Sequence, residues 1–452
     1  MADAFDLVII GGGPAGQAAA LALDGHGLSI AVVDEQLRPG GQILRQPPAT
    51  FRVANWLPGK TYDPLKAQLA RFAALDSVEW LGGHSAIGLL RDGEGFAVQA
   101  SGPEGARRLA TRRVLVAAGC QDLAVPLPGW TLPGVYAAGG IQAFVKSQQI
   151  VPGERVVLAG THPLMLMIAA QIVAAGGTVA SVLFAQDMGT MVRSVLARTG
   201  AALGYATDLM AAAGAMMALR RAGVPVRFGV GLEAVLGDTR VTAVRTSAGE
   251  IACDAVGLCY GFVPQSALPR MAGARVRPAG PAGGWAVLAD EWMESSIPGL
   301  FVAGETTGVA GAPAAMAAGE LAGIGIARKM GLIDATTASR SAGTPRRAHA
   351  DRLEFAALLD AVADPTGHLP RPAPDTIACR CEDVTFAAID AEIAGGGSAN
   401  AVKLVTRCGM GPCQGRNCEP TLLRRIGRAD DPGFTQRFPA RPVTIGDLAG
   451  PA

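Results

Sequence analysis

Short, fully apolar runs that lead directly into glycine turns dominate the pattern of this chain. Residues 7–10 read Leu-Val-Ile-Ile, and the turn over 11–16 reads Gly-Gly-Gly-Pro-Ala-Gly. A helix is expected over 17–23, and a second apolar strand over 28–33 ends at Asp34. Continuous apolar runs of this length are typical of strands buried in a parallel sheet. The pattern therefore predicts a strand, turn, helix and strand at the N-terminal end.

The glycine turn has the spacing of a dinucleotide-binding site. In G-x-G-x-x-G, Gly11 permits the tight turn, Gly13 lets the backbone approach a pyrophosphate, and Gly16 lets the helix pack close to the strand. The first amides of that helix favour an anion. Asp34 lies where a carboxylate accepts hydrogen bonds from a ribose, and Glu35 is its rival for that contact. The alternative is an ordinary strand-to-helix turn with spare glycines.

Two later apolar strands end in related signatures. Residues 114–118 form a strand that ends at Gly119, and residues 297–305 form another that ends in Gly304-Glu305. These segments resemble signatures of disulfide-reductase-like flavoproteins, and the resemblance implies FAD as the dinucleotide. In those enzymes an acid at the second strand end hydrogen-bonds the ribityl chain. Here that acid is Glu305, where aspartate is more usual; its alternative role is a favourable charge in the first turn of a helix.

The expected FAD site combines the first glycine turn, the loop after Asp34 and the two later strand ends. Its candidate residues are Gly11, Gly13, Pro14, Ala15, Gly16, Asp34, Glu35, Gly41, Gln42, Ala118, Gly119, Gly304 and Glu305. No C-x-x-C or C-x4-C pair lies near this site, so disulfide-reductase chemistry lacks its thiols. Cys120 is interpreted as a small core residue. None of the five histidines has a recognisable acid–base arrangement, and no catalytic residue is predicted.

A second nucleotide-type unit in the middle of the chain has a damaged turn. Its strand is expected over 156–159 and its helix over 164–174. The turn over 160–165 keeps one glycine, and Leu183 stands where the ribose-binding acid would be. The side chain of His162 hinders close approach of the backbone to a pyrophosphate. We expect a domain that keeps the fold and binds NAD(P)H poorly or not at all.

Five of the eight cysteines crowd into one segment near the C-terminus, which in a reducing compartment indicates a metal centre. Cys379 and Cys381 form a C-x-C pair, and Cys413 and Cys418 form a C-x4-C pair. Four thiolates separated by a helical hairpin can converge on a [2Fe–2S] cluster. Structural zinc is the alternative, although C-x-C fits its usual ligand spacing poorly. We predict these four cysteines as ligands and Cys408 as a buried spare or an alternate ligand.

Composition supports a compact protein of several domains. The chain has 452 residues, of which 50% are hydrophobic and 17% charged, and this disfavours disorder. Its 39 basic and 38 acidic residues give no electrostatic footprint for nucleic acid. We expect neither a signal peptide nor a transmembrane segment, and therefore a cytoplasmic protein whose membrane association, if any, is made through partners.

The sequence predicts an α/β fold with two Rossmann-like dinucleotide-binding domains of the disulfide-reductase-like flavoprotein type and a small, mainly helical C-terminal [2Fe–2S] domain. The expected boundaries are 1–148 for the first part of the FAD-binding domain, 149–275 for a degenerate NAD(P)-like middle domain, 276–332 for the return of the FAD-binding domain, 333–373 for a linker with one short helix over 352–362, and 374–452 for the cluster domain.

Several motifs together resemble one known family over nearly the whole chain. They are Asp34-Glu35-Gln36 with Pro39-Gly40-Gly41-Gln42, the Leu-Pro-Gly-Val turn before Gly139-Gly140-Ile141-Gln142, residues 302–309 and residues 406–416. The chain resembles the α (A-type) subunit of hetero-oligomeric dye-linked amine dehydrogenases, which include opine oxidase, D-hydroxyproline dehydrogenase, L-proline dehydrogenase and hydrogen cyanide synthase. Its C-terminal module is similar to bacterioferritin-associated ferredoxin, which implies a [2Fe–2S] cluster.

The resemblance implies that the chain is part of an oxidoreductase that uses CH–NH or CH–NH2 donors. In that family an FAD-containing β subunit of the D-amino-acid-oxidase-like type oxidises the amine, and the α subunit passes its electrons to a downstream acceptor. A small ferredoxin-like γ subunit occurs in some complexes. FMN at a subunit interface, an adenine nucleotide in the middle domain, and the choice among opine, hydroxyproline, proline and glycine remain open.

Two other functions compete with an electron-transfer subunit. The first is a stand-alone NAD(P)H-dependent FAD and iron–sulfur reductase, against which the damaged middle turn argues. The second is a non-enzymatic cluster carrier with a vestigial flavoprotein attached, against which the intact motifs at Gly11 and Glu305 argue.

Overall fold

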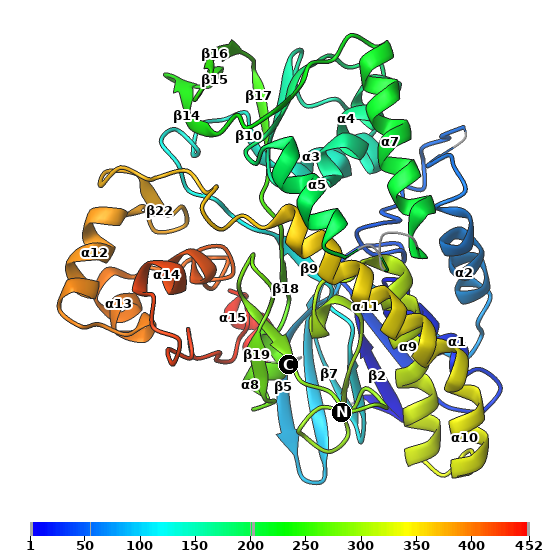
Figure 1. Cartoon of the computed structure of the whole chain (residues 1–452). Coiled ribbons are helices and arrows are strands. Elements are labelled where there is room, and N and C mark those ends of the chain that lie inside the picture. The colour runs from blue at the N-terminus through cyan, green and yellow to red at the C-terminus, as the bar shows by residue number, and fades with distance from the viewer. Residues whose placement is uncertain (1–2, 55, 199, 201–203, 450–452) are drawn as a thin grey trace.

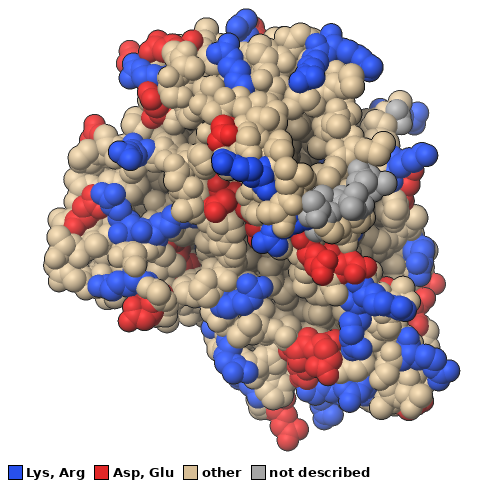
Figure 2. Space-filling view, viewed as in Figure 1, with Lys and Arg blue, Asp and Glu red and all other residues tan. Residues whose placement is uncertain are grey.

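The computed structural model describes residues 3–449 apart from 55, 199 and 201–203. Three parts are visible in Figure 1: the N-terminal sheet with its helices, a second sheet in the middle of the chain, and a small C-terminal domain. In the described residues no helix is long and apolar enough to cross a membrane. Figure 2 shows basic and acidic side chains interspersed over the face in view, without a large area of one sign.

The first nucleotide-binding unit is a parallel five-stranded sheet. Its strands, in spatial order, are β21 (Leu300–Val302), β8 (Val114–Val116), β2 (Leu7–Ile10), β3 (Ile30–Asp34) and β4 (Val78–Gly82). One face packs on α1 (Pro14–Ala22) and α9 (Gly311–Lys329), and the other packs on a sheet of β1 (Asp3–Phe5), β7 (Gly105–Thr111), β6 (Gly95–Gly102) and β5 (Ser85–Asp92). In β2, Leu7 and Ile9 join the helical face while Val8 and Ile10 join the other sheet. Burial on both faces explains the continuous apolar run.

The second unit is also a parallel five-stranded sheet. Its strands, in spatial order, are β10 (Val135–Ala137), β17 (Ala255–Cys259), β11 (Val156–Gly160), β12 (Val179–Phe184) and β13 (Val226–Phe228). The two sheets agree with the predicted pair of Rossmann-like units. The expected boundary at residue 149 is too late, because β10 and the following α3 (Ala138–Ala143) pack in the core of the second unit. The pairing of β10 with β17 spans more than a hundred residues, which local periodicity does not reveal.

Shorter elements complete the two units. The helices are α2 (Asp63–Ala73), the π-helix η1 (Phe144–Gln148), α4 (Leu164–Ala174), α5 (Met188–Leu196), α7 (Ala206–Arg221), α8 (Ala267–Met271) and the 3-10 helix η2 (Gly304–Thr307). The strands are β9 (Cys120–Asp122), paired with β18 (Phe262–Pro264); β14 (Leu232–Gly237), β15 (Val241–Thr246) and β16 (Gly249–Ala252), which form one sheet; and β19 (Val276–Pro278), paired with β20 (Trp285–Val287).

The segment predicted as a linker is a pair of packed helices. They are α10 (Ala335–Ser341) and the long α11 (Gly343–Ala363), which lies across α9 and α5 (Figure 1). Ala338 and Leu358 are fully buried. The predicted short helix is the last part of α11. The prediction was wrong because small buried alanines and arginines that stack on an aromatic ring, such as Arg346 over Trp292, give little hydrophobic periodicity.

The C-terminal domain is small and mainly helical, as predicted. Its elements are β22 (Ile377–Cys379), β23 (Val384–Thr385), α12 (Phe386–Ala394), α13 (Ala399–Thr406) and α14 (Glu419–Ile426). The chain then returns to the first unit, where the Ala440 amide donates to the Ile87 carbonyl at 2.7 Å and α15 (Ile445–Ala449) lies beside β7. The range 374–452 is therefore not one separate domain, because its last described residues pack on the first unit.

We expect Gly319→Ala to destabilise the first unit. A Cβ at Gly319 of α9 would lie 2.0 Å from the Ala15 carbonyl oxygen of α1, so the two helices would have to separate. Overpacking of this kind costs about 1–3 kcal/mol in the free energy of unfolding. Thermal unfolding followed by circular dichroism measures the loss.

Gly214→Ala is the matched control, because Gly214 is exposed in α7 and a Cβ there meets no heavy atom within 4 Å. Replacing this helical glycine should stabilise the protein by up to about 1 kcal/mol. Equal stability of Gly319→Ala and the wild type would contradict the close approach of α1 and α9.

Candidate functional sites

Of the three glycines of the G-x-G-x-x-G motif, Gly11 and Gly16 lie in close contact with other backbone atoms, whereas Gly13 has free space beside it. A Cβ at Gly11 would lie 2.3 Å from the Ala117 carbonyl oxygen, and one at Gly16 would lie 2.0 Å from the Gly11 carbonyl oxygen. A Cβ at Gly13 would meet only the Cα of Gly41, at 3.6 Å. The open backbone at Gly13, together with the start of α1, fits a pyrophosphate.

Asp34 fixes the turn from the end of β3. Its two carboxylate oxygens accept hydrogen bonds from the amides of Gly12 and Gln36, each at 2.7 Å. Burial raises the pKa of Asp34, and these amide bonds oppose the shift. Glu35 instead forms an ion pair with Arg441 in the C-terminal segment. The structure thus places Asp34 at the turn and directs Glu35 towards another part of the chain.

Lys146 links the predicted loop to the second unit. Its ammonium group donates to the carbonyls of Gln42 at 2.8 Å and Ile43 at 3.3 Å, and to Gln142 Oε1 at 3.0 Å. Burial lowers the pKa of Lys146 to about 7. Gly41 of the same loop lies over Gly13, and a Cβ at Gly41 would come within 2.8 Å of the Gly13 Cα. The sequence motifs did not indicate Lys146, because the π-helix that carries it has no local sequence signal.

The return strand brings Gly304 and Glu305 beside the start of α1. A Cβ at Gly304, whose φ is +68°, would lie 3.0 Å from the Ala15 Cβ. The Cys120 thiol, which follows Ala118 and Gly119, donates to Glu305 Oε2 at 2.9 Å. Burial raises the pKa of both groups, so this thiol stays protonated and is no nucleophile.

We call the residues of the first glycine turn, together with Asp34, Gly304 and Glu305, the dinucleotide pocket. Two further residues lie beside Glu305. The Thr306 hydroxyl beside Glu305 is buried and has no hydrogen-bond partner among the described residues. A buried polar group of this kind needs a partner, which a polar ligand would supply. Cys120 as a residue is partly exposed, whereas its thiol is buried against Glu305.

The damaged turn of the second unit is covered by the C-terminal end of α11. Thr161 is fully buried, and its hydroxyl donates to the Ala363 carbonyl at 2.6 Å. Gln186 Nε2 donates to the carbonyls of Thr161 at 2.6 Å and Val362 at 2.9 Å. Burial lowers the pKa of His162 to about 4, so this side chain is neutral. Carbonyl groups at a helix end carry partial negative charge and disfavour a phosphate.

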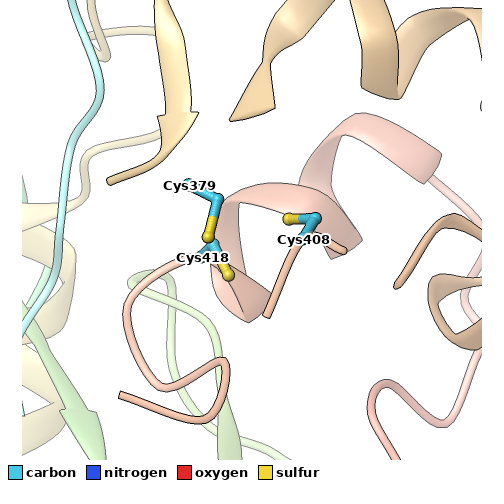
Figure 3. Close-up of side chains that lie close together, drawn as sticks. All are labelled: Cys379, Cys408 and Cys418. Carbon is cyan, nitrogen blue, oxygen red and sulfur yellow. The ribbon is translucent and has the colours of Figure 1, made fainter. Parts of the chain in front are cut away.

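The cysteines of the C-terminal domain gather in one place. Figure 3 shows Cys379, Cys408 and Cys418, whose sulfur atoms lie within 4.8 Å of one another and are buried. Cys381 and Cys413 are half-buried and hydrogen-bond to each other. The structure therefore joins two predicted ligands, Cys379 and Cys418, with the predicted spare, Cys408. It pairs the other two predicted ligands with each other.

The thiols of the buried group influence one another's pKa values. Hydrogen bonds from Cys408 and Cys418 lower the pKa of Cys379 to about 2 and raise the pKa values of both donors. A metal ion would replace those protons, since thiolates are the ligand form. The loop from Cys408 to Cys418, here called the cysteine loop, contains Gly409 and Gly415. The ring of Phe434 packs on both glycines, and a Cβ at either position would come within 2.5 Å of a ring atom. Three buried sulfur donors with two more cysteines in the same domain suit the ligand chemistry of an iron–sulfur centre or zinc.

The C-terminal domain is fixed to the rest of the protein by specific polar contacts. Arg270 forms a bidentate ion pair with Glu419 at 2.9 and 3.0 Å, and the two side chains are only 11% and 9% exposed. Trp130 Nε1 donates to the Ile377 carbonyl at 2.7 Å, and Gln121 Nε2 donates to the Arg416 carbonyl at 2.7 Å. These contacts hold the C-terminal domain against α8, the turn at Trp130 and β9.

Comparisons with known proteins agree with this architecture. Residues 5–319 match the family described as pyridine nucleotide-disulphide oxidoreductase. The A-type subunit of opine oxidase from Rhizobium meliloti (strain 1021) is 33% identical over 98% of this chain and 98% of that protein. The HcnB subunit of hydrogen cyanide synthase from Pseudomonas protegens (strain DSM 19095 / LMG 27888 / CFBP 6595 / CHA0) is 31% identical over 96% of each.

Two solved structures share the fold. L-proline dehydrogenase from P. horikoshii has a TM-score of 0.70 at 20% identity and covers 99% of this chain and 80% of its own. T. acidophilum thioredoxin reductase has a TM-score of 0.54 at 18% identity and covers 72% of this chain and 99% of its own. These likenesses confirm the predicted disulfide-reductase-like flavoprotein fold.

We expect Glu419→Gln to weaken the docking of the C-terminal domain. The variant keeps the shape of the side chain and leaves Arg270 as a buried charge without its counter-ion, which costs about 3–5 kcal/mol. Limited proteolysis and thermal unfolding measure the effect. Asp390→Asn is the control, because its pair with Arg425 is exposed to solvent and is worth less than about 1 kcal/mol. Equal losses in the two variants would show that the buried pair does not anchor the domain.

Proposed function

The chain belongs to the pyridine nucleotide-disulphide oxidoreductase family and to the group that contains the A-type opine oxidase subunit and HcnB of hydrogen cyanide synthase, and on this premise we propose that it transfers electrons within an amine dehydrogenase. This family membership confirms the resemblance found in the sequence motifs. In this proposal the chain is an FAD- and [2Fe–2S]-containing subunit of a hetero-oligomeric amine or amino-acid dehydrogenase.

One observation carries the proposal: a dinucleotide pocket and a thiol cluster lie on either side of β9. Cys120 of this strand contacts Glu305 in the pocket, and Gln121 contacts Arg416 in the cysteine loop. Disulfide-reductase chemistry has no thiol pair there, because no C-x-x-C pair lies beside Glu305 in the part of the chain that the structure describes. Two candidate redox sites in one chain suit a subunit that receives electrons from another protein.

The residues of the pocket fit FAD. Gly13 and the amides of α1 would hold the pyrophosphate, Asp34 the adenosine ribose, and Glu305 with Thr306 the ribityl chain. FAD exchanges two electrons as a pair or singly, and a [2Fe–2S] cluster exchanges one. The protein's contribution is binding, orientation and the exclusion of water.

The proposed cluster ligands are the predicted set of Cys379, Cys381, Cys413 and Cys418. The side-chain contact between Cys381 and Cys413 gives one pair, and the buried contact between Cys379 and Cys418 gives a second. Cys408 packs beside the second pair and is the alternate ligand.

The proposed electron donor is an FAD-containing β subunit of the D-amino-acid-oxidase-like type. The relatives from opine oxidase, hydrogen cyanide synthase and sarcosine oxidase are all named as subunits, which supports a partner for this chain. Opines, hydroxyproline, proline and glycine are the candidate substrates of the complex. A cytoplasmic location belongs to the same proposal, as does a small ferredoxin-like γ subunit of the kind that occurs in some complexes. For a further cofactor, FMN at a subunit interface and an adenine nucleotide in the middle domain are the two alternatives.

The competing function is a stand-alone NAD(P)H-dependent reductase. The α11 cap over Thr161 argues against it, because helix-end carbonyls stand where a pyrophosphate would bind. We therefore expect NADH and NADPH to leave both centres oxidised in an anaerobic stopped-flow titration followed at the flavin and iron–sulfur absorption bands. The same protein should be reduced when an amine-oxidising partner and its substrate are added. Rapid bleaching by NADH alone would favour the reductase.

Iron content tests the proposed ligand set. Cys413→Ser should lose most of the iron, because a [2Fe–2S] cluster needs four protein ligands. Cys408→Ser should keep the cluster, and Cys253→Ser, a buried cysteine of the middle unit, is the control for the substitution itself. Iron analysis and electron paramagnetic resonance (EPR) of the reduced protein provide the measurements. Loss of iron in Cys408→Ser with retention in Cys413→Ser would replace Cys413 by Cys408 in the ligand set.

A further inference from the structure

A continuous chain of covalent and hydrogen bonds joins the dinucleotide pocket to the cysteine loop. It starts at Glu305, whose Oε2 accepts a hydrogen bond from the Cys120 thiol at 2.9 Å. The next residue, Gln121, donates through Nε2 to the Arg416 carbonyl at 2.7 Å. Arg416 in turn donates to the Cys413 carbonyl from its amide at 3.2 Å and from Nε at 3.1 Å. Figure 1 places β9 between the first unit and the C-terminal domain, where this chain of bonds crosses.

We propose that β9 is the electron route between the two redox sites and that Gln121 is the residue that couples them. This inference rests on the proposed function and names the path for it. Electronic coupling falls less steeply along covalent and hydrogen bonds than across gaps between non-bonded atoms. Gln121 marks the point where the route leaves the flavoprotein fold and enters the cysteine loop.

The position of Gln121 is fixed from both sides. Gln265 Nε2 donates to Gln121 Oε1 at 2.6 Å, so the amide group of Gln121 is oriented with its nitrogen towards Arg416. The strand itself is held by antiparallel pairing with β18, in which Gln121 is opposite Val263. A side chain with both amide atoms hydrogen-bonded has a single orientation, which is what a coupling residue requires.

With both groups bound, each transfer along this route would carry one electron from the reduced flavin to the oxidised cluster. A second transfer would need the cluster to be reoxidised by a one-electron acceptor, for which ferricenium serves in the test. Two transfers would together remove two electrons and one proton from the anionic reduced flavin, and the proton would leave to solvent. The route adds no other reactant.

Gln121→Leu tests the route in the full chain loaded with flavin and cluster. The variant keeps the side-chain size and removes the bonds to Arg416 and Gln265. A laser flash with 5-deazariboflavin and EDTA injects one electron, and the relaxation between the flavin and cluster absorption bands gives the intramolecular rate. We expect this rate to fall roughly tenfold. The reduction potentials and the EPR spectrum of the reduced cluster should stay as in the wild type.

Trp130→Phe is the matched control. It removes another hydrogen bond between the flavoprotein fold and the C-terminal domain, that from Trp130 Nε1 to the Ile377 carbonyl at 2.7 Å, and leaves the β9 route intact. Its intramolecular rate should change less than about twofold. If Gln121→Leu does not bind both cofactors, Gln121→Met repeats the loss of hydrogen bonds with a more flexible side chain.

The possible outcomes separate the route from the function. An unchanged rate in both Gln121 variants, or equal slowing in Trp130→Phe and Gln121→Leu, would overturn the route while leaving electron transfer between the centres in place. Absence of any intramolecular relaxation in the wild type would overturn the proposed function and the route together. A selective loss of rate at Gln121 with unchanged potentials supports the route.

Discussion

The close approach of backbone segments at the first glycine turn is the constraint on which the rest of the structure depends. Gly11 lies against the end of β8, Gly16 against the turn itself, and Gly319 of α9 against Ala15 of α1. Any of these positions with a Cβ would push apart segments that must meet. Because they do meet, strand ends from three distant parts of the sequence lie side by side, and Glu305 comes within hydrogen-bond distance of Cys120.

The two nucleotide-type units share a fold but differ at the turn after their first strand, where a dinucleotide phosphate would bind. In the first, helix-start amides and an open glycine favour a phosphate. In the second, the residues after β11 carry side chains, and the carbonyls that end α11 are hydrogen-bonded by Thr161 and Gln186. The second unit nevertheless keeps the complete five-stranded sheet, including β10 and β17.

The C-terminal domain, which carries the cysteine cluster, is attached rigidly to the rest of the protein. The buried pair of Arg270 with Glu419 and the hydrogen bonds from Trp130 and Gln121 fix the domain at a defined place. The last part of the chain adds Arg441, which pairs with Glu35 beside the first glycine turn. The proposed electron transfer requires such fixed spacing, whereas a flexibly linked carrier domain would not need buried ion pairs.

The sequence by itself determined the two Rossmann-like units and the helical C-terminal module, and it predicted the damaged middle turn and the sets of ligand-binding glycines and cysteines. These features depend on short-range rules: burial on both faces of a strand, the turn geometry of glycine and the spacing of thiols. Only the tertiary structure decided that α11 caps the middle turn, that Cys408 joins Cys379 and Cys418, and that Lys146 contacts the loop at Gln42. Each is a contact between residues far apart in the sequence, and the sequence around either residue gives no indication of its partner.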